Sequence, residues 1–371
     1  MRSYERGAAS GLQGPPGHFY PVMEEEDTMI PSRWLVPPVV SVFAFVLALS
    51  WGAVAGTAPA PAPAKADQKL VRITVARGVS HLSLWGIQTF AAKYGLRTEV
   101  LDTNTNAEMQ RYIQAAQVEV GALGYQSPAI MAEQNVGTVK VIAGIYNSGQ
   151  NLIMRKGVDL KSWKDLEGKR IGRPPGTYVG ILFTLAAQTN GVDLAKVNLV
   201  NTTAVGTAEL QALKNGDLDG LLLWSPVIDR AVVEGYGYYP PCCDISSTKE
   251  FGGGNQILGA NAEFLKDRQT VVNFLKAFME AKEFYGKNRE KAVEVISQYT
   301  GVGKDVVLEA LKHSFWESRV DIQTAINVAK QGPKFGFTKA DVSGKVPAYF
   351  DMSFLAEATG KPVEQLTSFG R

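Results

Sequence analysis

Apolar and polar residues alternate along most of the chain in runs that predict strands and helices in turn. The apolar run at 70–76 (LVRITVA) is typical of a strand, and the segment 83–95 (SLWGIQTFAAKYG) has the apolar spacing and the closing glycine of a helix. A second strand is expected at 97–102 (RTEVLD). Alternation of this kind predicts parallel sheets covered by helices, an α/β fold class.

One order of elements occurs twice. Residues 98–134 have the pattern of a strand, a polar loop, an amphipathic helix, a short apolar strand and a Ser-Pro pair, and residues 197–235 repeat this order. Serine before proline is a specific signal for a helix start, so we expect further helices to open at Ser127 and Ser225. The repeat therefore predicts two lobes of similar construction.

Loops that join strands to helices gather at the carboxyl edge of such sheets, and two facing edges form a cleft. We expect the chain to cross between the lobes at 145–153 and to return at 251–260, where Gly252 to Gly254 permit hinge rotation. A plain flexible loop is the alternative for these glycines. The candidate ligand-binding residues on the cleft loops, at the first crossing and at a strand end are Ser80, His81, Tyr125, Gln126, Ser127, Asn147, Arg173, Gly176, Thr177, Tyr178, Thr203 and Trp224.

The stretch 168–192 (GKRIGRPPGTYVGILFTLAAQTNGV) predicts a strand, a tight turn and a helix. Thr177 is a suitable N-cap, and the pair Asn190-Gly191 marks the end of the helix. Backbone N–H groups and the positive end of the helix dipole would then face a ligand, which indicates a site for an anion or a polar group. An ordinary connection between strand and helix is the alternative.

Length and composition limit the possible functions. The chain has 371 residues, of which 45% are hydrophobic, enough for two domains or one large one. The net charge of +2, without a run of basic and aromatic residues, argues against binding of nucleic acid. We find no phosphate-binding glycine loop, metal-ligand spacing or Ser-His-Asp arrangement, so we expect no catalysis, no cofactor and no metal.

The N-terminal region differs from the rest of the chain. Arg33, an apolar stretch and the small residues at 53–55 resemble a secretory signal with its cleavage site. An uncleaved membrane anchor is the alternative, because residues 34–54 are long enough to span a bilayer. The acidic run at 24–27 is unlike the start of a signal, so we take Met29 as the true start. Export to the periplasm is therefore expected.

The only two cysteines, Cys242 and Cys243, are neighbours. Consecutive Cα atoms lie about 3.8 Å apart, below the roughly 4.4 Å lower limit of ordinary disulfides. We therefore favour two buried free thiols, with a vicinal disulfide in an oxidising compartment as the alternative.

After residue 261 the pattern becomes helical, and Phe274, Phe278 and Phe284 are expected in the core. The boundaries that we expect are 1–55 for a leader with a signal peptide, 56–68 for a Pro/Ala linker, 69–147 for the first part of lobe 1, 148–252 for lobe 2, and 253–371 for the return to lobe 1 and the C-terminal helices.

Four stretches carry a resemblance to a known family: 121–132 (GALGYQSPAIMA), 165–180 (DLEGKRIGRPPGTYVG), 212–231 (ALKNGDLDGLLLWSPVIDRA) and 264–288 (FLKDRQTVVNFLKAFMEAKEFYGKN). The chain over 70–366 resembles periplasmic substrate-binding proteins of nitrate/sulfonate/taurine ABC transporters. The resemblance implies a two-lobed periplasmic-binding-protein fold of type II, with a helical C-terminal extension packed on lobe 1. It also implies a monomer that closes on a small ligand and delivers it to a membrane permease.

The resemblance assigns ligand contact to Ser80, His81, 125–127, 176–178 and Trp224. Relatives often carry Trp-Glu-Pro where this chain has Trp-Ser-Pro at 224–226, and the missing acid disfavours a ligand amine. We therefore expect a small organic anion, a sulfonate or a carboxylate, with an aromatic body as one form. The alternatives are a heterocycle such as a pyrimidine or thiamine precursor, and a related biosynthetic enzyme.

Overall fold

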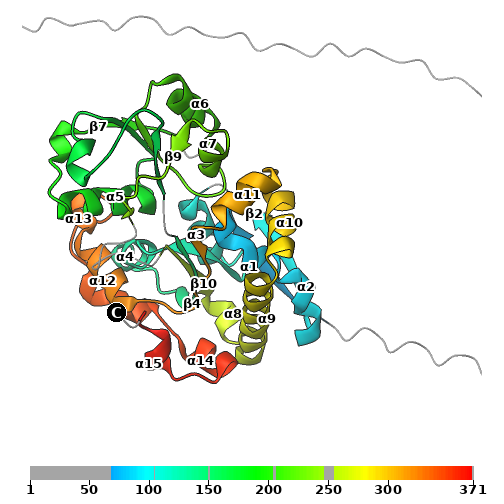
Figure 1. The fold of residues 1–371 in the computed structure, drawn as a ribbon. Helices are drawn as coiled ribbons and strands as arrows, with labels where there is room; N and C mark the ends of the chain where they lie inside the picture. Colours follow the sequence, from blue (N-terminus) through cyan, green and yellow to red (C-terminus); the bar gives the residue numbers. More distant parts are fainter. Residues whose placement is uncertain (1–67, 104, 149–150, 204–205, 246–254, 370–371) are drawn as a thin grey trace, which may run out of the picture. The chain divides into compact units, whose positions relative to one another are not determined.

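The computed structural model describes residues 68–103, 105–148, 151–203, 206–245 and 255–369 (Figure 1). The chain divides into two units, 1–60 and 61–371, and all described residues belong to the second. The predicted leader, signal peptide and nearly all of the linker therefore lie outside the described residues, as do the predicted hinge glycines 252–254.

The larger sheet has six strands, and β10 lies near its centre. Strand β1 is parallel to β2 and β3, whereas β10 is antiparallel to both β3 and β4, and β11 is antiparallel to β4. In spatial order its strands are β11 (Ser314–Phe315), β4 (Val139–Ser148), β10 (Gln256–Asn261), β3 (Val120–Gly124), β1 (Lys69–Val75) and β2 (Leu96–Asp102).

The smaller sheet has five strands. Strand β6 is parallel to β7 and β8, but β5 is antiparallel to β8 and β9. In spatial order the strands are β7 (Asn198–Asn201), β6 (Arg170–Arg173), β8 (Gly220–Leu222), β5 (Leu152–Arg155) and β9 (Gly237–Tyr238). The predicted parallel pairing therefore holds for β1, β2 and β3 and for β6, β7 and β8, but both sheets are mixed. Strands β5 and β10 carry the chain into the smaller sheet and back into the larger one, and they run against their neighbours. The lobe boundaries remain a proposal.

Helix starts explain how several loops are held. Thr105 caps α3 (Asn106–Gln114), since its hydroxyl accepts the Glu108 N–H at 3.2 Å. As expected, α4 (Ser127–Glu133) opens at the Ser-Pro pair, with Ser127 as its first residue and Gln126 at the N-cap position. The predicted start at Ser225 is wrong, because residues 225–228 form a turn and the helix begins only after them. The other helices of this region are α5 (Tyr178–Thr189), α6 (Thr207–Asn215) and α7 (Asp229–Val233).

The helix predicted at 83–95 is broken into short pieces, α1 (Leu82–Trp85), α2 (Gln88–Ala91) and the 3-10 turn Ala92–Tyr94, and another 3-10 turn, Val79–His81, precedes them. The helices α1 and α2 and the turn Ala92–Tyr94 pack against α9 (Arg268–Lys287). Packing against α9 thus replaces the single continuous helix that the apolar spacing predicted.

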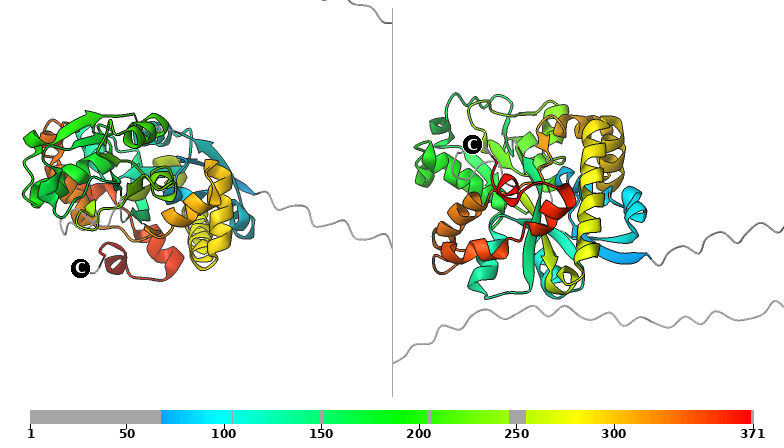
Figure 2. Two further views of the ribbon diagram at one scale, coloured as in Figure 1. Left: turned by 45° about the horizontal axis from the view of Figure 1, so that its top comes forward. Right: turned by 90° about the horizontal axis from the view of Figure 1, so that it is seen from below.

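Helices dominate the C-terminal part, and α9 lies along α1 and α2 in both views of Figure 2. Phe274 and Phe278 are fully buried and Phe284 packs at the edge of the core, which confirms the expected core positions. The remaining helices are α8 (Ala262–Leu265), α10 (Arg289–Thr300), α11 (Lys304–Ala310), α12 (Ile322–Lys330), α13 (Gly332–Phe335), α14 (Ser353–Thr359) and α15 (Val363–Leu366), with 3-10 turns at Trp163–Leu166, Leu194–Lys196 and Ser343–Tyr349.

Cys242 and Cys243 form a disulfide, so the favoured prediction of two free thiols is wrong. A tight turn, closed by the Cys243 N–H on the Pro240 carbonyl at 3.2 Å, holds the two residues. Cys243 is buried, and the sulfur of Cys242 lies 3.7 Å from the Leu160 carbonyl oxygen. The Cα spacing of neighbouring residues was therefore a poor guide to whether these two cysteines form a disulfide.

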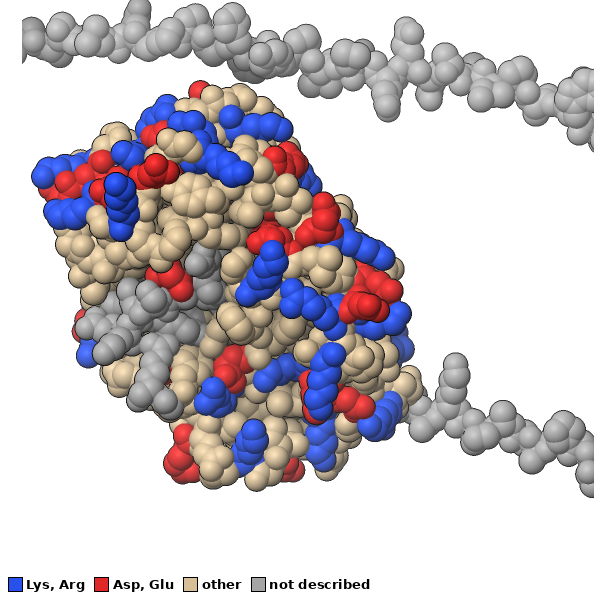
Figure 3. Space-filling view, viewed as in Figure 1, with Lys and Arg blue, Asp and Glu red and all other residues tan. Residues whose placement is uncertain are grey.

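The surface carries charges of both signs. On the face shown in Figure 3, Lys and Arg lie among Asp and Glu without a large field of one sign. Over the stretches that the structure describes, no helix is both long and apolar enough to cross a bilayer.

Candidate functional site

A cavity of about 610 Å³ lies between loops of the two sheets. Its walls come from the loops after β1, β3, β6 and β8, from α3, and from the start of β10. The sequence-predicted residues that line it are Ser80, His81, Gln126, Ser127, Gly176, Thr177, Tyr178 and Trp224. Strand ends that are far apart in the sequence thus converge on one cavity, as the alternating pattern predicted. Contact of these residues with a ligand stays a prediction.

The lining of this cavity does not include Tyr125, Asn147, Arg173 and Thr203. Tyr125 is 1% exposed, and its ring stacks on that of Tyr178 with the centroids 6.0 Å apart. Its hydroxyl accepts the Asp321 N–H at 3.2 Å. Tyr125 therefore supports an aromatic wall from behind.

The other three predicted residues are held elsewhere. Thr203 is exposed, and its hydroxyl bonds the carboxylate of Glu209. Asn147 lies in the β4 ladder opposite Phe315. Arg173 is the last residue of β6, just before the cavity-lining loop. Ligand roles for these residues remain predictions.

The turn before α5 has the predicted structure. The Thr177 hydroxyl accepts the Gly180 N–H at 3.3 Å and donates to the Pro174 carbonyl at 2.8 Å. Its proton is therefore used within the loop, so Thr177 holds the helix start in place instead of donating to a ligand. Gly176 has a φ of 69°, and a Cβ built there meets no atom within 4 Å. The backbone conformation, and not crowding by protein atoms, requires glycine at this position.

His81 ties the first loop to the returning strand. It is 1% exposed, its Nδ1 lies 2.7 Å from the Ala76 carbonyl oxygen and 3.2 Å from the Ala76 nitrogen, and its Nε2 contacts the side-chain oxygen of Gln256. Burial lowers the pKa of the imidazole, so the ring is neutral at pH 7. His81 accordingly supplies shape and a hydrogen-bonding frame, and no positive charge.

The polar lining is almost uncharged. Among the described lining residues none is Asp, Glu or Lys, and the single arginine, Arg111, is exposed on α3. Hydroxyls and amides supply the polarity instead, and the amide side chains are Asn106, Gln110, Gln114, Gln126, Gln134, Asn151, Asn255 and Gln256. Recognition in this cavity therefore depends on hydrogen-bond geometry more than on charge.

The part played by α3 was not predicted from the sequence. Asn106, Gln110 and Gln114 are spaced by four residues and share one face of the helix, which lines the cavity. Met109 and Ile113 are fully buried beside them. In the sequence, the amides stand at every fourth position next to an apolar stripe. This pattern is also typical of a helix face that meets water, so it did not indicate a cavity.

A buried carboxyl lies behind the cavity wall. Asp229 is completely buried at the start of α7, and the Tyr239 hydroxyl donates to its Oδ1 at 2.7 Å. Burial raises the pKa of Asp229 to about 6, although hydrogen bonds from Ser225 and Tyr239 oppose this. Ser225 lines the cavity and bonds Asp229. The acid therefore does not line the cavity itself but contacts a residue that does.

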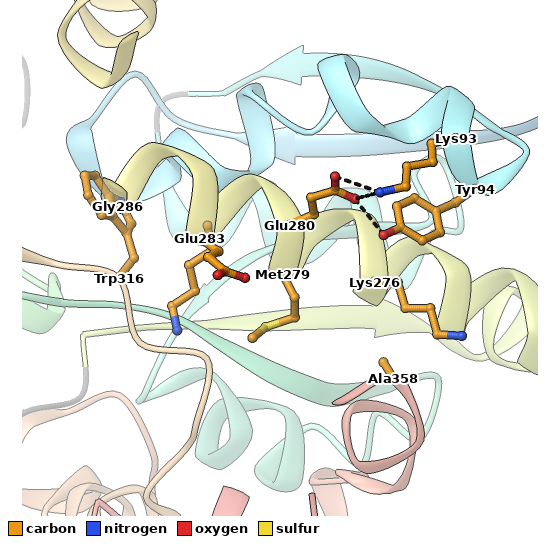
Figure 4. Close-up of a pocket in the computed structure, with 10 residues that line it drawn as sticks. Lys93, Tyr94, Lys276, Met279, Glu280, Glu283, Gly286, Trp316 and Ala358 are labelled. Carbon is orange, nitrogen blue, oxygen red and sulfur yellow. Dashed lines mark hydrogen bonds and ion pairs between the residues drawn. The ribbon is translucent and has the colours of Figure 1, made fainter. Parts of the chain in front are cut away.

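A second hollow, of about 710 Å³, lies on the outside of the molecule beside α9 (Figure 4). One ion pair lies within it: the Lys93 ammonium is 2.9 Å from both oxygens of Glu280, and the Tyr94 hydroxyl donates to the same carboxylate at 2.6 Å. Lys276, Lys282 and Glu283 complete a rim of long side chains. We call this hollow the α9 groove.

Metal chemistry has no candidate in the described part of the chain, where no three His, Cys, Asp or Glu side chains come together.

Sequence comparisons identify the family of this chain and some of its relatives. The sequence model of the family described as NMT1/THI5 like matches residues 89–292. A protein of Brucella abortus (strain 2308), described only as a binding protein, is 27% identical over 232 residues, covering 59% of this chain and 70% of that protein. The taurine-binding periplasmic protein of Escherichia coli (strain K12) is 26% identical over 148 residues, 40% of this chain and 45% of that protein.

Solved structures share the fold. The periplasmic aliphatic sulphonate binding protein SsuA from Escherichia coli has a TM-score of 0.65 at 14% identity, covering 76% of this chain and 91% of that chain. The desulfurization enzyme DSZB has a TM-score of 0.59 at 13% identity, covering 79% and 99%. At these identities the likeness shows the fold alone, and it confirms the predicted two-lobed periplasmic-binding-protein fold.

Proposed function

Because the chain belongs to the NMT1/THI5-like family, as the match over residues 89–292 shows, we propose that it is an extracytoplasmic solute-binding protein of an ABC importer. It captures a small organic solute and delivers it to the membrane permease. One observation carries the proposal: a cavity of about 610 Å³, lined by loops of two sheets, in a fold shared with the periplasmic sulphonate-binding protein. The signal peptide and the hinges at 145–153 and 251–260 belong to this proposal.

The solute that fits best is a small organic anion, a sulfonate or a carboxylate, with a flat body. Tyr178 and Trp224 supply aromatic surface for the body. Around the anionic end, the start of α5 and the hydroxyls and amides supply donors, Arg111 supplies a cation, and no described lining residue is a carboxylate that would repel the anion. Without such a carboxylate beside Trp224, a ligand ammonium group has no counter-ion.

The energies are compatible with this assignment. Micromolar affinity requires roughly 8 kcal/mol, while a helix dipole contributes about 0.3 to 1 kcal/mol. Hydrogen bonds to a charged group contribute roughly 1.5 to 3 kcal/mol each. Two or three such bonds, with burial of the flat body, reach the required free energy.

Binding is favoured over catalysis by the state of His81. Both ring nitrogens are engaged, Nδ1 by the backbone of Ala76 and Nε2 by the side chain of Gln256, so neither is presented as a base. The shared fold of the desulfurization enzyme leaves the enzyme as the second candidate.

A thermal-shift panel of sulfonates, aromatic carboxylates, nitrate and pyrimidines tests the proposal. A ligand at about one hundred times its dissociation constant stabilises the folded state by roughly 2.7 kcal/mol. We expect organic sulfonates or carboxylates to raise the Tm most. A panel in which no compound raises the Tm would contradict the proposal, and chemical conversion of a bound compound would favour the enzyme.

A further inference from the structure

One buried polar atom of a residue that lines the cavity has no partner among the described residues. Gln126 lies at the start of α4, is 4% exposed and lines the cavity, yet its Oε1 accepts no hydrogen bond from any described residue. A buried carbonyl oxygen without a donor destabilises the folded protein, because it has lost its hydrogen bonds to water. Native proteins rarely leave such an atom unpaired without a functional reason.

The position of this amide is built into the backbone. A Cβ placed on Gly124, the last residue of β3, would lie 2.2 Å from the Gln126 Oε1 and 3.0 Å from the Asn106 Nδ2. The Gln126 amide thus occupies the space that a side chain at 124 would need, and glycine there permits the close approach. The acceptor is thus unpartnered among the described residues, and the backbone leaves room for it, so a donor from outside the protein can satisfy it.

The chemistry of the lining restricts that donor. Sulfonate and carboxylate oxygens only accept hydrogen bonds, so the anionic end of a ligand cannot satisfy the Gln126 Oε1. An ammonium group could donate, but no described lining residue is a carboxylate that would balance its charge. An uncharged N–H or O–H group remains.

We propose that Gln126 is a specificity-determining acceptor that selects solutes carrying an uncharged N–H or O–H donor in addition to their anionic end. The inference rests on the proposed function and goes further, because it excludes nitrate and simple alkyl or aryl sulfonates as the preferred solute. Gln114 supports it independently, since its buried Nε2 on the cavity face of α3 also has no partner among the described residues and requires an acceptor. A hydroxyl, an amide or a heterocyclic lactam carries both kinds of group.

Matched benzenesulfonates test the proposal by calorimetry. In 4-aminobenzenesulfonate and 4-methylbenzenesulfonate the charge and the shape are nearly the same, and only the amino compound, uncharged at its nitrogen at neutral pH, has N–H donors. The 3-substituted pair and the two hydroxybenzenesulfonates allow for different distances between the ends. We expect the best amino or hydroxy compound to bind about tenfold more tightly than its methyl counterpart.

Variants connect this preference to the residue. Gln126→Met should abolish the difference between amino and methyl compounds, and Gly124→Ala should reduce it by displacing the amide. Gln126→Glu keeps an acceptor and should keep the preference while weakening all sulfonates. Gln211→Met, at an exposed glutamine on α6 outside the cavity, is the matched control. A melting curve for each variant shows that it is folded.

The outcomes separate the two proposals. Equal affinity for methyl and amino compounds in the wild type, or a preference that survives in Gln126→Met, overturns the role of Gln126 but leaves the proposed function intact. Failure of every benzenesulfonate to bind at millimolar concentration contradicts the anionic solute itself and, with it, this inference.

Discussion

The cavity between the two sheets and the α9 groove are of similar size but differ in how their polar groups are satisfied. In the groove, Lys93 and Tyr94 both bond Glu280, so this carboxylate is neutralised and hydrogen-bonded within the protein. In the cavity, the Gln126 Oε1 and the Gln114 Nε2 are buried and unpartnered among the described residues. No buried side-chain polar atom of the described residues that line the larger hollow lacks a partner, while two such atoms belong to residues that line the smaller one. Unsatisfied polar atoms, and not volume, distinguish the candidate site.

Gly176→Val should have the largest effect on ligand binding in the cavity. A β-branched residue at a φ of 69° costs on the order of 1 to 3 kcal/mol of strain and distorts the turn before α5. We expect calorimetry to detect no binding of 4-aminobenzenesulfonate, although the protein still melts cooperatively. Gly168→Val is the matched control, because Gly168 has a φ of 82° with no neighbouring atoms and does not line the cavity. Similar affinity in both variants would show that the turn is not part of the site.

Asp229→Asn tests whether the buried acid behind the cavity wall makes the stability of the folded protein depend on pH. Burial raises the pKa of Asp229 to about 6, so its neutral form is favoured in the native state. The stability that it contributes is complete below the unfolded pKa of about 4 and is lost as the pH rises through about 6. The shift of roughly two pKa units corresponds to at most about 3 kcal/mol.

The variant should therefore melt above the wild type near pH 8, and the difference should shrink or reverse near pH 4. Differential scanning calorimetry across this range measures it. A difference in Tm that does not change with pH would mean that Asp229 titrates as an ordinary carboxyl.

Thr177→Ala should have a smaller effect. The hydroxyl bonds both the Gly180 N–H and the Pro174 carbonyl, so its loss loosens the helix start that lines the cavity. We expect affinity for 4-aminobenzenesulfonate to fall about tenfold, or about 1.4 kcal/mol. Thr177→Ser retains the hydroxyl and should bind as the wild type does. If serine and alanine weaken binding equally, the methyl group and not the cap is responsible.

Glu280→Gln should change the α9 groove without changing the cavity. The hydrogen bond to Glu280 is the main reason that the pKa of Tyr94 is raised, so in the variant Tyr94 should ionise at a lower pH, which an ultraviolet titration detects. Affinity for 4-aminobenzenesulfonate should be unchanged. A loss of affinity would mean that the groove and not the cavity holds the solute.

Local patterns predicted local structure well. The strand at β1 and the cap at Thr177 agree with the expected positions within a residue, because each depends on neighbours in the sequence. Ser225 shows the limit of this reasoning. The same Ser-Pro signal opens α4 at Ser127, but at Ser225 it precedes a turn.

The candidate site was predicted in outline. Loops at strand ends meet because parallel strands place their carboxyl ends at one edge, and this accounts for Ser80, Ser127 and Trp224 in the cavity. The amides of α3 were missed, since a polar helix face looks the same in sequence whether it meets water or a cavity. Tyr125 and Thr203 were placed on the right loops but bond other partners.

Residues close together in the chain were enough to predict the order of strands and helices, the family to which the chain belongs, and the caps and turns that depend on adjacent positions. The direction of β5 and β10, the disulfide between Cys242 and Cys243, and the unpaired amide of Gln126 over Gly124 became visible only in the folded chain. The physical reason is the range of the forces involved. Helix caps and strand alternation arise within a few residues, whereas strand direction and the satisfaction of a buried polar atom depend on segments that only folding brings together.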